Sequence, residues 1–326
     1  MLTEVYHNIY LSDCPLPNSP LRTINVFIIK GEDRNIIIDT GFCEDACRKA
    51  LFDSLHALSI DLKKTDLFLT HLHPDHSGLA AELYQQGATV HASPYTAEYL
   101  NNMVEPEFWP NRVRRFEKLI GMEPGSINVY ELQPYKYRYL EKIPIQLICE
   151  EESSVLKSGE YTFEVINFHG HEPGQIALYE RKHRLIFSGD HILNEISPNI
   201  GSMDTETDFL RIYCENLYKM RNMNISQVFS AHRSQIKNHR DRIDELLTHH
   251  KKRLEETANI LNEDTYTVRQ VAGKMSWRIK ADSFDAFPST QKWFAVTEAM
   301  AHLEWLRHHG YVNREEKNGI FYYSLN

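Results

Sequence analysis

The stretch Leu67–Leu83 reads LFLTHLHPDHSGLAAEL and places three histidines and an aspartate within six residues. These side chains are His71, His73, Asp75 and His76. An apolar run precedes them and an alanine-rich run follows, which predicts a strand, a turn at the proline and a helix. Because side chains two apart on a strand point to the same side, His71 and His73 can face one ion together. Neutral imidazoles and carboxylates suit Zn²⁺, Fe or Mn better than Ca²⁺, so this stretch predicts a transition-metal site.

The same residue types follow three further apolar runs. NFHGHEPG supplies His169 and His171, IFSGDHIL supplies Asp190 and His191, and VFSAHRSQ supplies His232. Each run predicts a strand, so each polar group is expected at the rim where a strand ends. A single residue of this kind is more often a capping or hydrogen-bonded group. Their recurrence on successive strands predicts one shared site.

Strands alternate with helices around these residues. Apolar β-branched runs at 25–30 and 35–41 predict a hairpin, and a helical apolar period covers 43–58. Further strands are predicted at 66–70 and 89–93. Such alternation of strands and helices predicts an α/β fold.

Residues 94–144 depart from this alternation. Pro106 and Pro110 interrupt the predicted helices there, and a tyrosine-rich segment follows them. We interpret this region as a helical insertion over the α/β core. In it, Phe108, Trp109 and Tyr135 could roof an apolar pocket.

Five motifs in a fixed order carry a resemblance to a known family. They are IIIDTG, THLHPDHSG, HGHEPGQIAL, FSGDHIL and FSAH. In these motifs, over residues 5–235, the chain resembles the metallo-β-lactamase superfamily, whose hydrolases share an αββα sandwich. The resemblance implies two divalent metal ions held by seven side chains. His71, His73 and His171 would bind the first ion, Asp75, His76 and His232 would bind the second, and Asp190 would bridge the two.

Four residues in or near these motifs need a separate interpretation. His171 is favoured over His169 because it precedes EPGQ, which matches the turn after the family's ligand. His169 faces the same way by strand period and stays an alternative. Asp39 matches the aspartate of the family's DTG turn and is expected to orient the site rather than to bind metal. Asp75 is expected to bind metal first and, as the catalytic carboxylate, to manage protons after attack.

The implied chemistry is hydrolysis by a metal-bridging hydroxide. A water shared by two divalent ions is acidified towards neutrality and attacks an electrophilic carbonyl or phosphorus. Zinc is the expected ion, and iron or manganese also fit the ligands. The predicted substrate is a small ester, thioester or lactone. The alternatives are an endoribonuclease or phosphodiesterase acting on single-stranded RNA, and a metal-dependent binding protein without catalysis.

A boundary predicted near 262–266 separates a catalytic domain at 1–261 from a smaller unit at 262–326. The smaller unit reads as a short helix, a longer helix and a hairpin, with Asn318-Gly319 suited to a tight primed turn. This order resembles a winged helix. Residues 251–326 hold 11 basic and 10 acidic side chains, unlike the basic face of a duplex-binding module. We therefore expect this unit to pack against protein, either the catalytic domain or a second copy in a homodimer, and nucleic acid to be an unlikely partner.

Composition sets broader limits on the class of protein. The 326 residues carry a formal net charge of −9, which argues against a surface made for nucleic acid or anionic lipid. No apolar run approaches the roughly 20 residues that a membrane helix needs. The N-terminal residues lack a signal-peptide pattern. The five cysteines are scattered and odd in number, which does not indicate a disulfide framework. We expect a cytoplasmic protein that acts on a small molecule.

Overall fold

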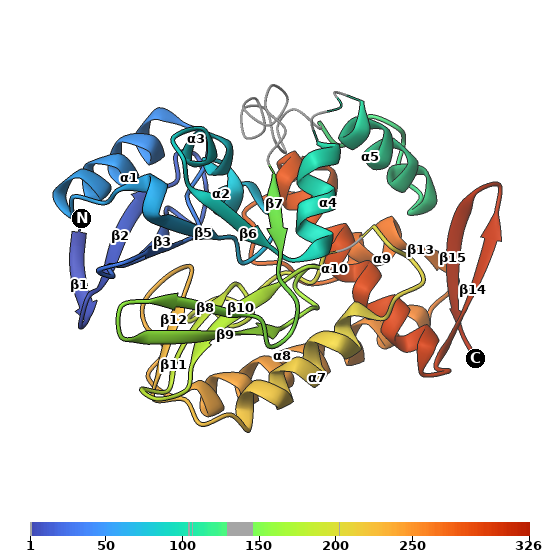
Figure 1. The fold of residues 1–326 in the computed structure, drawn as a ribbon. Coiled ribbons are helices and arrows are strands. Elements are labelled where there is room, and N and C mark those ends of the chain that lie inside the picture. Colours follow the sequence, from blue (N-terminus) through green and yellow to red (C-terminus); the bar gives the residue numbers. More distant parts are fainter. Residues whose placement is uncertain (1, 104, 106, 129–145, 202) are drawn as a thin grey trace.

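Two β-sheets pack face to face, and helices cover the outer side of each sheet (Figure 1). This computed structural model describes residues 2–103, 105, 107–128, 146–201 and 203–326. The arrangement is an αββα sandwich, so the predicted α/β fold class is confirmed. Within the described residues, every helix is too short or too polar to cross a lipid bilayer.

The first sheet keeps its strands in sequence order. Strands β1 to β4 are antiparallel neighbours, whereas β4 to β7 run parallel. The predicted hairpin is the β3–β4 pair, in which Phe27 lies opposite Ile38. The strands are β1 (Leu2–Tyr6), β2 (Ile9–Pro15), β3 (Thr23–Ile29), β4 (Asn35–Ile38), β5 (Thr65–Phe68), β6 (Thr89–Ala92) and β7 (Leu147–Cys149).

The second sheet has the order β12-β11-β10-β9-β8. Its neighbours are antiparallel except β11 and β12, which run parallel. Consequently the carboxyl ends of β11 and β12 lie at the same edge of the sheet. The strands are β8 (Val155–Ser158), β9 (Tyr161–Asn167), β10 (Ile176–Glu180), β11 (Leu185–Gly189) and β12 (Gln227–Ser230).

Apolar side chains from both sheets fill the space between them. The ring of Phe27 on β3 lies 5.2 Å, centre to centre, from both Phe187 on β11 and Phe229 on β12. Strands β4, β10 and β11 are buried at every position. Because they are covered on both faces, their sequences are nearly continuous apolar runs rather than alternating ones. This packing holds the strand ends of the two sheets in place relative to each other.

Helices complete the two outer layers of the sandwich. Leu51 and Leu55 of α1 (Asp45–Ala57) pack on the first sheet together with Leu83 of α3 (Ala80–Gln85). On the second sheet lie Leu217 of α7 (Phe209–Arg221) and Leu246 of α8 (His239–Leu261). The remaining short helices are α2 (Pro74–Ser77) and two 3-10 turns, η1 (Leu62–Lys64) and η2 (Phe284–Ala286).

The predicted insertion contains α4 (Pro94–Asn102) and α5 (Phe108–Leu119). The expectation that Pro110 interrupts a helix is wrong, because Pro110 lies in the first turn of α5, where its missing N–H has no intrahelical partner to lose. Phe108 and Trp109 pack their rings against Tyr99. Tyr135, the third residue of the predicted roof, lies in 129–145, outside the described residues. Pro106, the other predicted helix break, also lies outside them.

The C-terminal residues form a smaller unit beside the sandwich (Figure 1). Its sheet has the order β13-β15-β14, and its hairpin turns at Asn318 and Gly319 with φ of 56° and 77°. Both values match the predicted primed turn. The elements are β13 (Tyr266–Thr267), α9 (Val268–Lys274), α10 (Ser289–His308), β14 (Val312–Lys317) and β15 (Ile320–Leu325).

One apolar core joins this C-terminal unit to the body of the molecule. Val296 and Leu303 of α10 share it with Phe116 of α5 and with Ile260 and Leu261 of α8. The predicted boundary after residue 261 therefore falls at the end of α8, and the last residues of α8 belong to the core that they share with the C-terminal unit. The unit packs against the rest of the chain rather than standing apart from it.

Candidate metal centre

The ligand-type residues of the opening motif lie where β5 ends and α2 begins. His71 and His73 follow the strand, and Pro74 occupies the first position of α2 with His73 as the N-cap. The ring of proline suits that position, because the first helical N–H groups have no partner within the helix. The short helix then turns Asp75 and His76 towards the same side, and both are buried.

Three strands of the second sheet supply the rest of the site. His171 follows β9, Asp190 follows β11 and His232 follows β12. Gly189 precedes Asp190 with φ of 53°, and a Cβ there would lie 2.7 Å from the side chains of both Thr70 and Gln175. Only glycine fits this turn, which directs Asp190 into the space between the sheets' ends.

Three imidazole nitrogens converge at the first predicted metal position. His73 Nδ1 lies 2.9 Å from His71 Nε2 and 3.1 Å from His171 Nε2. Burial lowers the pKa of all three rings, that of His73 to about 3. The rings are therefore neutral near neutral pH, which is the state in which histidine binds a metal ion.

A second cluster joins two histidines to two carboxylates. His232 Nε2 lies 3.4 Å from Asp75 Oδ2 and 3.5 Å from Asp190 Oδ1, and His76 Nε2 lies 3.6 Å from Asp190 Oδ1. Asp190 Oδ2 lies 3.8 Å from His171 Nε2 of the first cluster, so this carboxylate stands between the two. Burial on its own would raise the pKa of both carboxyls, but the histidines lower it, and the net direction is downward. Burial lowers the pKa of His76 and His232, but the carboxylates raise it, and the net direction is upward. Positive charge, either on these rings or on a bound metal ion, must therefore balance the two buried carboxylates.

Unpartnered atoms show whether these residues fit metal ions. Among the described residues, His76 Nε2, His232 Nε2 and Asp190 Oδ1 are buried without a hydrogen-bond partner. An unsatisfied buried polar atom costs about 1–3 kcal/mol, so such atoms are rare unless something else binds them. Three groups of three ligand atoms, each with all atoms within 4.8 Å of one another, together contain the seven predicted ligands. The donor set and its spacing fit two adjoining divalent ions.

Asp39 lies behind the cluster, directly after β4. Its Oδ1 accepts a hydrogen bond from Thr70 N at 2.8 Å, and its Oδ2 lies 2.7 Å from His76 Nδ1. Its φ of 61° is in the left-handed region, which is rare for a residue other than glycine and marks a strained turn. Thr70 Oγ1 donates to Asp39 Oδ2 at 2.9 Å and lies 3.0 Å from His71 Nδ1. This placement agrees with the orienting role predicted for Asp39.

Two other ligand-type histidines donate from the ring nitrogen that faces away from the cluster. His171 Nδ1 donates to Asn199 O at 2.6 Å, and His232 Nδ1 donates to Thr23 O at 2.9 Å. Such bonds fix the tautomer, so that Nε2 presents its lone pair to a metal ion. Asn199 and Thr70 are absent from the predicted site. Thr70 directly precedes His71 and could have been suspected, whereas the sequence around Asn199 contains no signal for its role.

His169 and His191, the neighbours of predicted ligands, lie outside both clusters. Burial lowers the pKa of His169 and is the largest effect on it. The charges of Glu152 and Lys219, which lie near it, have smaller effects. His191 stacks on Phe168 with ring centres 4.2 Å apart. The structure thus brings His171 rather than His169 to the first cluster, and it leaves His191 in the apolar layer beneath α7.

Glu172 is a buried acidic residue that the sequence interpretation overlooked. It is 2% exposed and directly follows His171, and burial raises its pKa to about 8. Its position in HGHEPG was the available signal. A carboxyl whose pKa is raised by burial beside a candidate metal ligand makes Glu172 a candidate functional residue.

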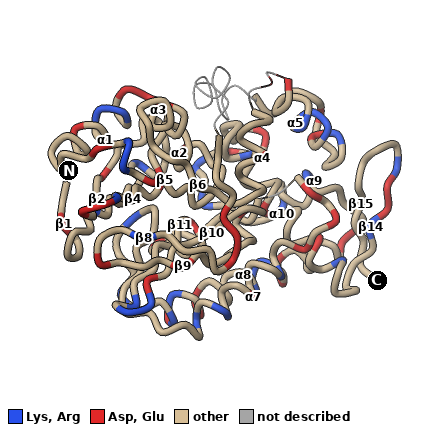
Figure 2. Tube along the Cα trace, in the orientation of Figure 1, with Lys and Arg blue, Asp and Glu red and all other residues tan. Residues whose placement is uncertain are grey.

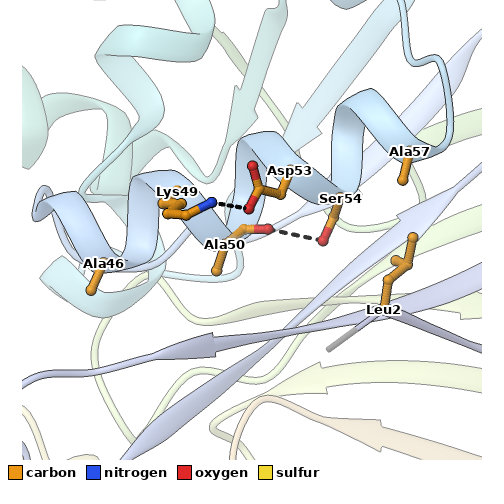
Figure 3. Close-up of a pocket in the computed structure, with 7 residues that line it drawn as sticks. All are labelled: Leu2, Ala46, Lys49, Ala50, Asp53, Ser54 and Ala57. Carbon is orange, nitrogen blue, oxygen red and sulfur yellow. Dashed lines mark hydrogen bonds and ion pairs between the residues drawn. The ribbon is translucent and has the colours of Figure 1, made fainter.

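A hollow beside the edge strand β1 of the first sheet has a different character (Figure 3). It is lined by Leu2 and one face of α1. Lys49 pairs with Asp53 at 2.6 Å, and Ser54 donates to Ala50 O at 2.9 Å, so its polar groups are already satisfied within the helix. Satisfied groups leave nothing to orient a ligand, and the histidine–aspartate clusters remain the candidate site.

Comparison with protein families agrees with this geometry. The family described as Metallo-beta-lactamase superfamily matches residues 20–267, a range that contains every residue of both clusters. The chain belongs to this superfamily. The assignment of individual ligands stays a prediction, and this chain has the residues for a metal-dependent hydrolase.

Two curated proteins illustrate the relatives of this superfamily member. Hydroxyacylglutathione hydrolase GloC of Haemophilus influenzae is 27% identical over 168 residues, which cover 51% of this chain and 65% of that protein. Acyl-coenzyme A thioesterase MBLAC2 of Gallus gallus is 26% identical over 205 residues, which cover 60% of this chain and 67% of that protein. The similarity therefore spans about two thirds of each relative's length.

Solved structures share the whole fold of this superfamily member. A metallo-beta-lactamase family protein from Thermus thermophilus has a TM-score of 0.81 at 25% identity and covers 99% of this chain and 100% of its own. A beta-lactamase domain protein from Burkholderia ambifaria has a TM-score of 0.84 at 24% identity and covers 100% of this chain and 94% of its own. Because both matches extend over nearly the entire chain, the sandwich and the C-terminal unit occur together in these structures too.

Proposed function

We propose that this superfamily member is a thioester hydrolase that acts on a small acyl substrate, with esters and lactones as related substrates. The observation that carries the proposal is the convergence of seven histidine and aspartate side chains from separate strand ends into two adjoining clusters. The weak similarity to a hydroxyacylglutathione hydrolase and to an acyl-coenzyme A thioesterase favours thioesters within that class.

The proposed cofactor is a pair of divalent ions, with zinc expected and iron or manganese compatible with the same donors. The first ion would be held by His71, His73 and His171. When bound, such ions supply an acidified water and polarise the carbonyl oxygen of a substrate. The chain contributes a buried, preorganised set of ligands, in which the imidazoles of the first cluster are already neutral.

Asp75 and Asp190 have different proposed roles in metal binding and hydrolysis. Asp190 stands between the clusters and would bridge the two ions. Asp75 would bind the second ion with His76 and His232 and would also relay protons.

The C-terminal unit is proposed to be winged-helix-like in form and to serve packing rather than nucleic-acid recognition. Trp293 of α10 packs its ring 5.6 Å from Trp109 of α5, so aromatic side chains of the presumed recognition helix are already engaged. Lys and Arg adjoin Asp and Glu along β14 instead of forming one basic face (Figure 2). A homodimer through this unit and a cytoplasmic location remain proposals that fit this surface and the five free cysteines.

Hydrolysis of a panel of acyl thioesters, esters, lactones and single-stranded RNA tests the proposal, with metal content measured in parallel. The informative variant is Asp190→Asn, which removes the bridging charge without changing side-chain size. Its thioester hydrolysis should fall by more than the about 10–100-fold that loss of an outer partner of a metal ligand costs. The matched control is Asp264→Asn, since Asp264 is exposed and distant in the chain from every cluster residue.

The panel separates the proposed function from its alternative. Thioester hydrolysis that follows metal content and is lost only in Asp190→Asn supports it. Cleavage of RNA with inert thioesters would establish the nuclease instead, and a metal-loaded protein that hydrolyses nothing in the panel would contradict the assignment of substrate class.

A further inference from the structure

The segment 196–201 lies between a predicted metal ligand and the C-terminal unit. On one side, Asn199 O accepts the hydrogen bond from His171 Nδ1 at 2.6 Å, and Gly201 N donates to His171 O at 3.2 Å. His171 is thus bonded to this segment through both its ring and its backbone. The position of the segment sets the position of the imidazole.

The side chain of Asn199 bonds the segment to helix α10. Asn199 Nδ2 donates to Phe294 O at 3.0 Å and lies 3.4 Å from Glu298 Oε2. Asn199 Oδ1 lies 3.2 Å from Thr297 Oγ1. A Cβ on Gly201 would lie 2.8 Å from Asn199 Oδ1, so the segment also folds closely around this amide.

Helix α10 is itself held firmly at this point. Glu298 is 3.3 Å from Arg253 Nε of α8, and the guanidinium of Arg253 lies 4.3 Å from the centre of the Trp277 ring. The Glu298 side chain is 12% exposed and that of Arg253 is 9% exposed. Because charges this deeply buried cannot easily separate, α10 gives Asn199 a rigid anchor rather than a mobile one.

We propose that Asn199 is a positioning residue through which helix α10 holds His171 in its metal-binding orientation. The C-terminal unit is then part of the metal centre, although none of its side chains reaches the clusters through a described contact. The proposal rests on His171 as a ligand and is independent of which substrate the protein hydrolyses.

Metal titration of the metal-free protein tests this proposal. Wild type, Asn199→Ala and the control Asn194→Ala are titrated with Co²⁺ and Zn²⁺ against a competing chelator, and the visible absorption of bound Co²⁺ is recorded. Asn194 lies in the same connection between β11 and α7 but donates to Ser234 and Gln235 instead of to α10. The control therefore reports on general loosening of this connection.

Asn199→Ala keeps the backbone carbonyl that accepts from His171 and removes only its anchor on α10. It should therefore weaken one of the two metal-binding steps by about tenfold, the lower end of the 10–100-fold that outer partners of metal ligands contribute, and change its Co²⁺ spectrum. The other step, and both steps of Asn194→Ala, should stay as in wild type. Thr297→Val removes a hydroxyl that bonds to both Asn199 and Trp293 O. This variant should show a smaller effect in the same direction. It also provides the test if Asn199→Ala does not fold.

Three results would overturn the proposal. The first is unchanged metal binding and an unchanged Co²⁺ spectrum in Asn199→Ala or, where that variant does not fold, in Thr297→Val. The second is an equal loss of affinity at both metal-binding steps in Asn199→Ala and Asn194→Ala. The third is a wild-type protein that takes up no metal. A wild type that binds both ions yet hydrolyses no thioester would contradict only the proposed function and leave the role of Asn199 to be decided by the titration.

Discussion

Gly78 ends the short helix α2 and has no room for a side chain. Its φ of −61° and ψ of −30° are ordinary right-handed helical values, so alanine is allowed by the backbone. A Cβ there would lie 2.6 Å from Cys43 N and 2.7 Å from Gly41 O, which is 0.7 to 0.8 Å short of the 3.4 Å where ordinary van der Waals contact begins. Both neighbours are backbone atoms, so they cannot turn away as a flexible side chain would.

The expected cost of Gly78→Ala follows from these contacts. Overpacking of this kind costs about 3 kcal/mol at the upper end of its usual range. Replacing glycine by alanine in helical backbone returns about 1 kcal/mol. We therefore expect the free energy of unfolding to fall by about 2 kcal/mol. Since α2 carries Asp75 and His76, its displacement should also weaken the second metal-binding step.

A matched control exists in α9. Gly273 also has no positive φ, but the nearest atom to its Cβ would be Phe284 Cβ at 3.8 Å, an ordinary contact. Gly273→Ala should therefore raise the free energy of unfolding by about 1 kcal/mol. Urea unfolding of the metal-free proteins, followed by tryptophan fluorescence, measures both variants. If Gly78→Ala proves as stable as Gly273→Ala, the reasoning from backbone contacts is wrong.

Three further predictions concern the site, the first sheet and the C-terminal unit. His171→Ala should lose metal from the first position and nearly all hydrolysis, whereas His169→Ala should keep both ions. Elemental analysis measures the metal content, and the opposite result would make His169 the metal ligand. Burial lowers the pKa of His91, hydrogen bonds to Asp66 and Glu150 raise it, and the net direction is upward. The charged form of His91 therefore stabilises the fold fully below the unfolded pKa of about 6.5, and this stabilisation is lost as the pH rises through the folded pKa. His91→Gln should therefore cost more stability at about pH 6 than at about pH 9 in urea unfolding, and equal costs would contradict this linkage. Deletion of 262–326 exposes the apolar face of α5 and should make the remaining protein less soluble, as measured by the soluble fraction after expression. Undiminished solubility would show that exposure of this face does not limit solubility.

Much of the fold could be predicted because its signals are local. The strand, proline turn and helix around His71 to His76 are specified by neighbouring residues, and so is the turn at Asn318-Gly319, whose residues tolerate positive φ. The strands β4 and β11 could be recognised as apolar runs because burial on both faces demands such runs. The ligand types of the site were predictable for a related reason, since they follow directly on strands that the pattern identifies.

Other features depend on contacts between distant segments, and no local pattern encodes them. Strand period alone places His169 and His171 on the same side, and only the path of the loop after β9 brings His171 alone to the cluster. Pro110 was expected to interrupt a helix, but α5 begins two residues before it, so Pro110 lies in the first turn, where its missing N–H has no partner to lose. Asn199 bonds residues about a hundred positions away in α10, so its role arises only when the C-terminal unit packs onto the sandwich. The sequence alone thus determined which chemistry the strand ends could carry, whereas tertiary packing decided which side chains meet there and what holds them, because those choices depend on long-range contacts.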